Sequence, residues 1–193
     1  MQKRILDRPF YRHEKFVNLK LKHYPVFIPY NLDFDTSSGR IRYGLTENAT
    51  TLKLIDRDIS LALDNYVNIS SFKTVKAYVW TYDDVSLKGN KSIKFKFQVI
   101  LATDRLNTFA ILNYDRLDLN SHGPVGFSEG SVCKQFTKSL DRRDLTRTSN
   151  VGRPGKHVYL LTVEGPIDDC PHVTGNYSML CWYKLSYIIS KHI

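Results

Sequence analysis

Cysteine and long apolar segments are both scarce in this chain of 193 residues. Its three cysteines, Cys133, Cys170 and Cys181, are too few for a small scaffold held together by disulfides. They form no Cys-x-x-Cys pair, so their spacing does not indicate a structural zinc site. The closest candidate for a membrane span, residues 179–189, is interrupted by Lys184 and is shorter than the roughly 18 to 20 residues that such a helix needs. We therefore expect neither a zinc module nor a membrane-spanning helix.

The N-terminus lacks a feature that secreted proteins carry. Residues 1–10 include basic side chains, but no apolar segment follows them, so they do not form a secretory signal peptide. If the protein is extracellular, we expect the chain to be a fragment, or the product of a gene model that misses its first exon.

Sequence patterns of catalytic sites are also lacking. Neither Gly-x-Ser-x-Gly nor His-Glu-x-x-His occurs, the glycines are too isolated to cradle a phosphate, and the six histidines have no metal-ligand spacing. Three pairs of carboxylates could offer oxygens to calcium, but none has the spacing of an EF-hand loop, which favours solvated turn residues. These pairs are Asp33 with Asp35, Asp83 with Asp84, and Asp168 with Asp169. We therefore expect no enzyme, no metal site and no cofactor.

Positive charge is in excess, at +9, and is concentrated in residues 1–24 and 134–156. Such clusters attract polyanions, which are nucleic acid inside a cell, sulfated glycosaminoglycan outside it and anionic lipid at either face of a membrane. In the second segment we hypothesise that Arg142, Arg143 and Arg147 form a sulfate-binding patch, and a solvated basic surface is the simpler alternative. Aromatic residues interleave with the basic ones in the first segment, a mixture that would also suit single-stranded nucleic acid in an intracellular protein.

Twelve tyrosines and ten phenylalanines favour strands over helices. The clearest pattern is a β-hairpin in which two apolar runs, residues 95–104 and 108–114, flank a short polar turn that Asp104 can close by accepting backbone N–H groups. A second hairpin is predicted over residues 31–43, around a Thr-Ser-Ser-Gly turn. Further strands are predicted at 24–30, where prolines at both ends favour an edge strand or an extended docking segment, at 72–82 and at 157–163.

Residues 51–64 form the only convincing helical pattern. Either Thr50 or Thr51 can cap its N-terminus. Apolar side chains recur at helical spacing on one face, namely Leu52, Ile55, Ile59 and Leu63. Charged side chains occupy the opposite face, as expected for a helix that lies across a sheet.

Six motifs follow one another along the chain. They are Asp-Phe-Asp-Thr (33–36) with Gly-Arg-Ile-Arg-Tyr (39–43), Val-Trp-Thr-Tyr-Asp-Asp-Val (79–85), Phe-Gln-Val-Ile-Leu-Ala-Thr-Asp (97–104), Thr-Phe-Ala-Ile-Leu-Asn-Tyr (108–114), Val-Gly-Phe-Ser-Glu-Gly (125–130) and Thr-Ser-Asn-Val-Gly-Arg-Pro-Gly-Lys (148–156). In identity and order they resemble the core of the NIDO domain, the nidogen-like extracellular module. One departure is Arg105, which stands where that family usually has glycine, so we expect a longer turn or one of another type.

The resemblance implies a mainly β (α+β) fold, with antiparallel or mixed sheets in a sandwich-like arrangement and one amphipathic helix packed on them. We expect a basic lead-in (1–24), the NIDO-like domain (25–163) and a cysteine-containing tail (164–193). The family has no catalytic residues to carry over, and we expect the motif residues to be structural. The implied function is non-catalytic cell–matrix adhesion outside the cell, with matrix proteins, cell-surface receptors or heparan sulfate as partners. The alternative is a polyanion-binding or nucleic-acid-binding module.

Four Asn-x-Ser/Thr sequons favour a secreted protein. They begin at Asn48, Asn68, Asn90 and Asn176. In an oxidising compartment one disulfide and one odd thiol are the natural outcome of three cysteines. Our hypothesis is that Cys170 pairs with Cys181, as their spacing permits, and that Cys133 stays unpaired.

Overall fold

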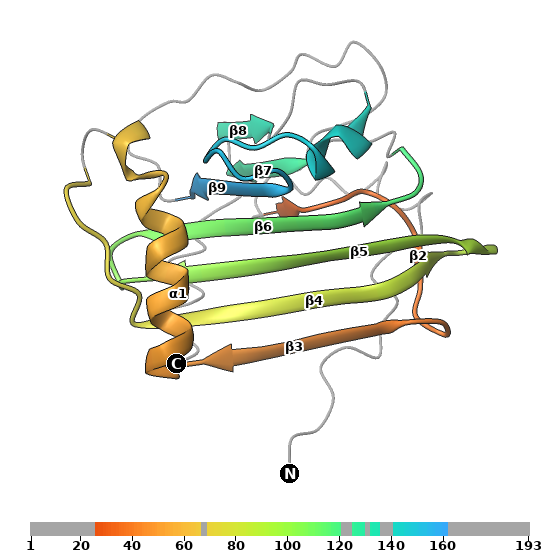
Figure 1. Ribbon diagram of the computed structural model, residues 1–193, viewed down its shortest axis with the longest axis horizontal. Coiled ribbons are helices and arrows are strands. Elements are labelled where there is room, and N and C mark those ends of the chain that lie inside the picture. The colour runs from red at the N-terminus through yellow and green to blue at the C-terminus, as the bar shows by residue number, and fades with distance from the viewer. Residues whose placement is uncertain (1–25, 67–68, 121–124, 130–131, 136–140, 162–193) are drawn as a thin grey trace.

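The computed structural model describes residues 26–66, 69–120, 125–129, 132–135 and 141–161, which form three layers (Figure 1). The helix α1 (Ala49–Ser60) crosses one face of a six-stranded sheet, and a three-stranded sheet lies over the other face. The large sheet contains β2 (Phe34–Asp35), β3 (Arg40–Thr46), β4 (Lys76–Leu87), β5 (Asn90–Thr103), β6 (Thr108–Leu117) and β9 (Lys156–Leu160), and the small sheet contains β1 (Val26–Ile28), β7 (Gly126–Glu129) and β8 (Val132–Gln135). All of these pairings are antiparallel, and the predicted fold class is confirmed. The small sheet has β1 at its edge, as its flanking prolines predicted.

The hairpin of β5 and β6 is the centre of the large sheet and matches the prediction. Asp104 closes its turn, because its Oδ1 accepts hydrogen bonds from the backbone N–H of Leu106 at 2.8 Å and of Asn107 at 2.6 Å. Arg105 takes a left-handed backbone with φ of 85°, so this position keeps a conformation suited to glycine although it carries an arginine.

The predicted second hairpin over residues 31–43 is wrong. Both β2 and β3 pair antiparallel with β4, at different positions along it, so they run in the same direction and cannot pair with each other as a hairpin. A bulge at Asp84 interrupts the ladder between them, with φ of 53° at that residue. Gly39 lets the chain pass this bulge, because a Cβ there would lie 2.3 Å from the carbonyl oxygen of Asp84.

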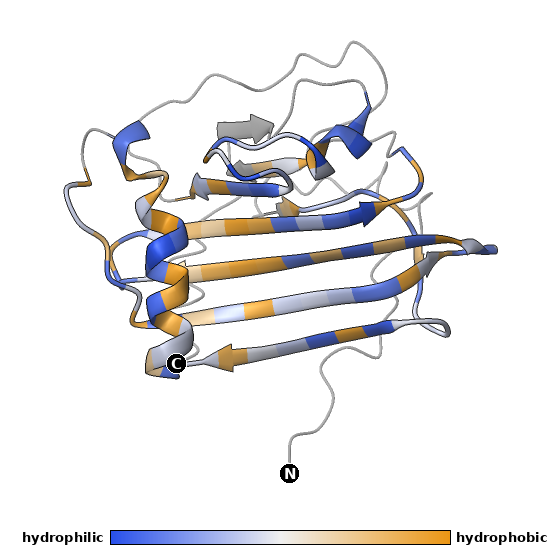
Figure 2. Ribbon diagram, in the orientation of Figure 1, coloured by the Kyte–Doolittle hydropathy of each residue, from blue (hydrophilic) through white to orange (hydrophobic). Residues whose placement is uncertain are grey.

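The helix α1 packs on the sheet through the predicted face, but it begins earlier than predicted. Its N-cap is Asn48, not Thr50 or Thr51, because Asn48 Oδ1 accepts a hydrogen bond from the backbone N–H of Thr51 at 3.1 Å. The helix ends at Ser60, and a separate 3-10 turn, η1 (Leu63–Asn65), follows it. Two of the four predicted apolar residues, Ile55 and Ile59, are buried, and they belong to a cluster with Ala77, Ile100, Ala102, Phe109, Ile111 and Val158 of the sheet. In Figure 2 the hydrophobic colouring of β5 and β6 gathers toward the end that α1 crosses.

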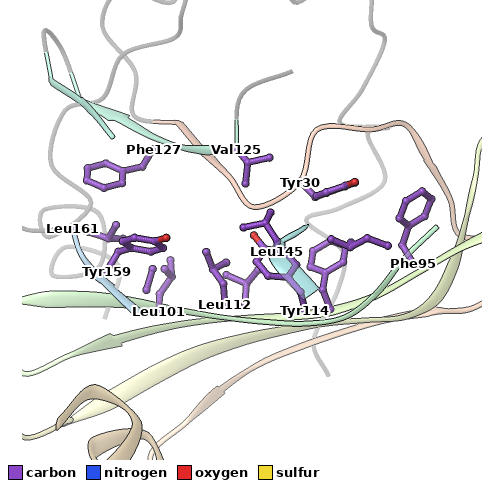
Figure 3. Packing of buried hydrophobic residues seen from close by; sticks show 14 of the residues in the cluster. Tyr30, Phe95, Leu101, Leu112, Tyr114, Val125, Phe127, Leu145, Tyr159 and Leu161 are labelled. Atoms are coloured by element: carbon purple, nitrogen blue, oxygen red, sulfur yellow. The ribbon is translucent and has the colours of Figure 1, made fainter. Parts of the chain in front are cut away.

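The larger core lies between the two sheets (Figure 3). Val125, just before β7, and Phe127 of β7 face Leu101 and Leu112 of the large sheet. Tyr114 donates a hydrogen bond to the carbonyl of Pro29, so its hydroxyl is satisfied in spite of its burial. Burial accordingly raises the pKa of Tyr114 well above its usual value.

Candidate functional site

The predicted arginine patch lies on a 3-10 turn, η2 (Arg142–Thr146), and on Arg147, which caps its C-terminus. The side chains of Arg143 and Arg147 are 52% and 75% exposed, and together with Asp141 and Thr146 they line a shallow depression of about 300 Å³. Arg142 differs from them, because it is half-buried and burial lowers its pKa. The structure therefore places two of the three arginines together on the surface.

Both exposed arginines of η2 lie beside carboxylates. Arg143 donates to Asp141 through Nε at 2.9 Å and through NH2, and Arg147 forms an ion pair with Asp144. The guanidinium of Arg143 lowers the pKa of Asp141 to about 2, so this carboxylate stays charged at physiological pH. An anionic ligand would have to share these arginines with the protein's own aspartates. The patch stays a prediction.

The motif at 148–156 has a structural role, because its side chains form hydrogen bonds with the backbone groups on the outer edge of β9. Asn150 donates from Nδ2 to the carbonyl of Val158 at 2.7 Å and accepts at Oδ1 from the N–H of the same residue at 2.9 Å. Ser149 donates from its hydroxyl to the carbonyl of Lys156 at 2.7 Å. The hydroxyl of Tyr66, from the segment after α1, accepts from the N–H of Leu160 at 3.0 Å. These bonds occupy outward-facing backbone groups of an edge strand, which would otherwise be free to pair with another chain.

Gly155 and Lys156, at the end of this motif, contact the neighbouring strand β6 and helix α1. A Cβ at Gly155 would lie 2.4 Å from the carbonyl oxygen of Tyr114, and its φ of 77° also requires glycine. The ammonium of Lys156 forms an ion pair with Asp58 of α1, where both side chains are less than a fifth exposed. Arg153 lies 3.5 Å from the same carboxylate. These basic residues therefore hold α1 against the sheet.

At the opposite edge of the large sheet, β3 has no outer partner strand among the residues that the structure describes. All seven of its residues are exposed except Thr46, which is half-buried, and within the described chain no side chain bonds to its outward backbone groups. Ile41, Tyr43 and Leu45 pair with Tyr82, Trp80 and Tyr78 of β4, and therefore lie on the same face as these aromatic residues. Tyr43 is 60% and Leu45 is 49% exposed. The alternation of apolar residues over 41–45 was visible in the sequence, but it could not show that the strand would lie at the edge of the described sheet.

Sequence analysis also missed a buried titratable group, His157 on β9. Its side chain is 4% exposed, its Nε2 donates to the carbonyl of Leu145 at 3.0 Å, and the hydroxyl of Tyr159 lies 3.5 Å from its Nδ1. Burial lowers its pKa, so the neutral ring is favoured. The sequence placed His157 in a predicted strand, but it did not show which face of that strand would be buried.

In each of the two described carboxylate pairs, at least one member is engaged by protein groups. Asp35 accepts a hydrogen bond from the N–H of Ser37 at 2.8 Å, and Asp83 forms ion pairs with Arg42 and Lys96. In the part of the chain that the structure describes, no group of three His, Cys, Asp or Glu residues could hold a metal ion. Asp168 and Asp169 lie outside the described residues.

Two of the four sequons can be placed. Asn48 and Asn90 are exposed, and both use Oδ1 as a hydrogen-bond acceptor, Asn48 at the helix cap and Asn90 toward Ser92 at 2.6 Å. A glycan would be attached to the amide nitrogen, so it is compatible with both bonds. Asn68 and Asn176 lie outside the described residues, as do Cys170 and Cys181, and the side chain of Cys133 on β8 is not described.

Comparison with known protein families gives one match, the nidogen-like domain, over residues 8–162. Comparisons with curated proteins and with solved structures return no match. Among the described residues no helix is long and apolar enough to cross a membrane. Because the match covers most of the chain, and the antiparallel sheets with one packed helix agree with the fold that the motifs implied, the chain belongs to the nidogen-like (NIDO) domain family.

Proposed function

We propose that this domain is a non-catalytic extracellular module that contributes to cell–matrix adhesion through protein or glycosaminoglycan contacts. The observation that carries the proposal is the match to the nidogen-like family, which is an extracellular family and in general non-enzymatic. Residues of the family motifs stabilise the fold: Asp104 accepts hydrogen bonds that close a turn, and Asn150 bonds to the backbone at a strand edge. This distribution supports a function that depends on surface contacts rather than on a convergent polar pocket.

Sulfated glycosaminoglycan is the partner class that the charge distribution favours. Three arginines and two aspartates lie on or beside η2, so the turn keeps a positive excess. The exposed guanidinium groups of Arg143 and Arg147 can each bind a sulfate oxygen while still contacting a carboxylate, because a guanidinium has five donors. Such binding is electrostatic and weakens as salt is added.

Heparin chromatography tests this patch. We expect the double variant Arg143→Gln/Arg147→Gln to elute at lower salt than the unmodified chain. The matched control is Arg57→Gln/Arg105→Gln, which removes the same charge from exposed arginines of α1 and of the β5–β6 turn. Equal elution of both double variants would show that total charge, and not this patch, retains the protein on heparin. Arg142 is left unchanged because its side chain is half-buried.

Treatment of the endogenous protein with N-glycosidase tests extracellular location. A band that moves down on a reducing gel after treatment would establish passage through the secretory pathway. Substitution of Asn48 or Asn90 by Gln should then each remove part of the shift if both sites carry glycans. An unshifted band near 22.4 kDa would instead favour the intracellular alternative, and retention on single-stranded DNA would become the next measurement.

The proposal extends to the remaining cysteines and to the limits of the domain. We expect a disulfide between Cys170 and Cys181 in the tail of residues 164–193, and a globular domain over residues 25–163 after a basic lead-in. A peptide map under non-reducing conditions checks the pairing, and any other pair, including one with Cys133, would contradict it.

A further inference from the structure

The two edges of the large sheet differ in how their backbone groups are satisfied. At β9 the side chains of Ser149, Asn150 and Tyr66 occupy outward-facing N–H and C=O groups. At β3 (Figure 1) no such bonds are formed within the described chain, and the strand runs for seven residues at the limit of the sheet. A strand of this length, whose outer backbone groups have no partner in the described chain, is a template for another strand.

Gly44 in the middle of β3 supports the approach of another chain. Its φ is not positive, and a Cβ at this position would have no heavy atom within 4 Å, so neither backbone geometry nor packing within the chain requires glycine here. A glycine inside a strand costs about 0.5–1 kcal/mol relative to alanine. Glycine in a strand often marks a place where another backbone or ligand approaches closely.

We propose that β3 pairs antiparallel with β3 of a second copy of this chain, about a two-fold axis at Tyr43. This register is the one that overlaps all seven residues. It sets Tyr43 opposite its own copy and Ile41 opposite Leu45 of the copy. It also sets Arg42 opposite Gly44 of the copy, which leaves room for the guanidinium, and Arg40 opposite Thr46 of the copy. No two charged side chains then face each other directly.

The pairing would also enlarge an apolar surface that the monomer leaves partly open. Tyr78 and Trp80 of β4 stack with ring centroids 6.0 Å apart, next to Leu45 and Tyr43. In an antiparallel pair, opposite residues point to the same side of the sheet, so both copies contribute these side chains to one continuous face. A strand from an unrelated protein could use the same edge, but the apolar residues Ile41 and Leu45, which lie symmetrically about Tyr43, favour a second copy.

Sedimentation velocity of the full chain over a range of concentrations tests this proposal. We expect a species of twice the chain mass of 22.4 kDa at high concentration, and a shift toward the single chain on dilution. Tyr43→Lys places two ammonium groups at the axis and should raise the dimer dissociation constant by at least about tenfold. Leu106→Lys is the matched control, since Leu106 is 79% exposed on the β5–β6 turn, and it should leave the dissociation constant unchanged.

Complementary charges test the register itself. Ile41→Lys/Leu45→Lys and Ile41→Glu/Leu45→Glu should each be monomeric alone, because like charges then face each other across the pair, and should form a heterodimer when mixed. Circular dichroism and thermal unfolding establish that each variant is folded. Failure of the mixture to associate would overturn the register. A wild-type chain that stays monomeric, or a dimer that Tyr43→Lys does not weaken, would overturn the proposal.

Discussion

Arg105 occupies a backbone conformation that glycine adopts more easily. Its φ of 85° lies in the left-handed region, where a residue with a Cβ pays about 1–2 kcal/mol. Arg105→Gly should therefore raise the free energy of unfolding by up to about 1 kcal/mol, after the greater flexibility of glycine in the unfolded chain is counted. Urea denaturation measures the change. Gly152→Ala is the converse control, because its φ is 72° in open space, and a loss of stability is expected there.

His157 makes stability depend on pH. Its pKa is lowered by burial in the folded chain, whereas in the unfolded chain it should be near the ordinary value of 6.5. The unfolded state therefore binds more protons as pH falls below about 6.5, and the free energy of unfolding should decrease from there downward by at most about 1.4 kcal/mol per pH unit. Tyr159 and Tyr114, whose rings lie against the ring of His157, keep uncharged hydroxyls throughout this range because burial raises their pKa.

Denaturation curves between pH 7.5 and 5 check this slope. His157→Gln keeps a donor for the carbonyl of Leu145 but does not titrate, so its slope in this range should be smaller than that of the unmodified chain. Equal slopes in the two proteins would mean that other groups control the acid sensitivity.

Among the elements, α1 depends on a cap that the sequence analysis did not identify. Asn48→Ala in the unglycosylated chain removes the acceptor for the N–H of Thr51 and should cost about 1 kcal/mol of stability. Asn48→Asp should retain most of it, since the carboxylate accepts the same bond. Thr50→Ala should cost nothing, and a loss at this position in thermal or urea unfolding would show that Thr50 contributes to the cap after all.

Elements whose signals are local could be predicted from the sequence. The turn of the β5–β6 hairpin is closed by its own Asp104, and α1 has an apolar stripe along one face. Both elements could therefore be predicted from residues close together in the sequence. The predicted hairpin over residues 31–43 was wrong because both short strands pair with β4, whose partner residues lie 31 to 53 positions later in the chain. Alternation of apolar residues predicts a strand, but it does not choose between possible partners.

The candidate sites were harder to predict for the same reason. Basic residues can be found in the sequence, but the ion pairs of Arg143 with Asp141 and of Lys156 with Asp58 depend on turn geometry and on contacts across the fold. The exposure of β3 is a property of the whole sheet, since it depends on which strand has no further neighbour.

At the scale of the whole molecule, stability should be highest where the three layers overlap. Strand β5 is paired on both sides, and residues 99–102 are buried on alternating faces, against the small sheet and against α1. Native-state hydrogen exchange should find the amides of this segment among the last to exchange, with opening free energies close to that of global unfolding. Earlier exchange there than in β4 would contradict this view of the core.

The large sheet can be extended by another chain at only one of its two edges, because side chains bond to the outer backbone groups of β9 but, in the described chain, not to those of β3. A protomer with one available edge can pair with one other copy through this sheet. Once two copies pair at β3, neither has a free edge left in the large sheet, and the assembly stops at a dimer. Two available edges would allow each copy to add another and would permit open-ended filaments. By occupying the outer backbone groups of β9, the side chain of Asn150 would thus prevent a third copy from adding to the pair, although it lies far from β3.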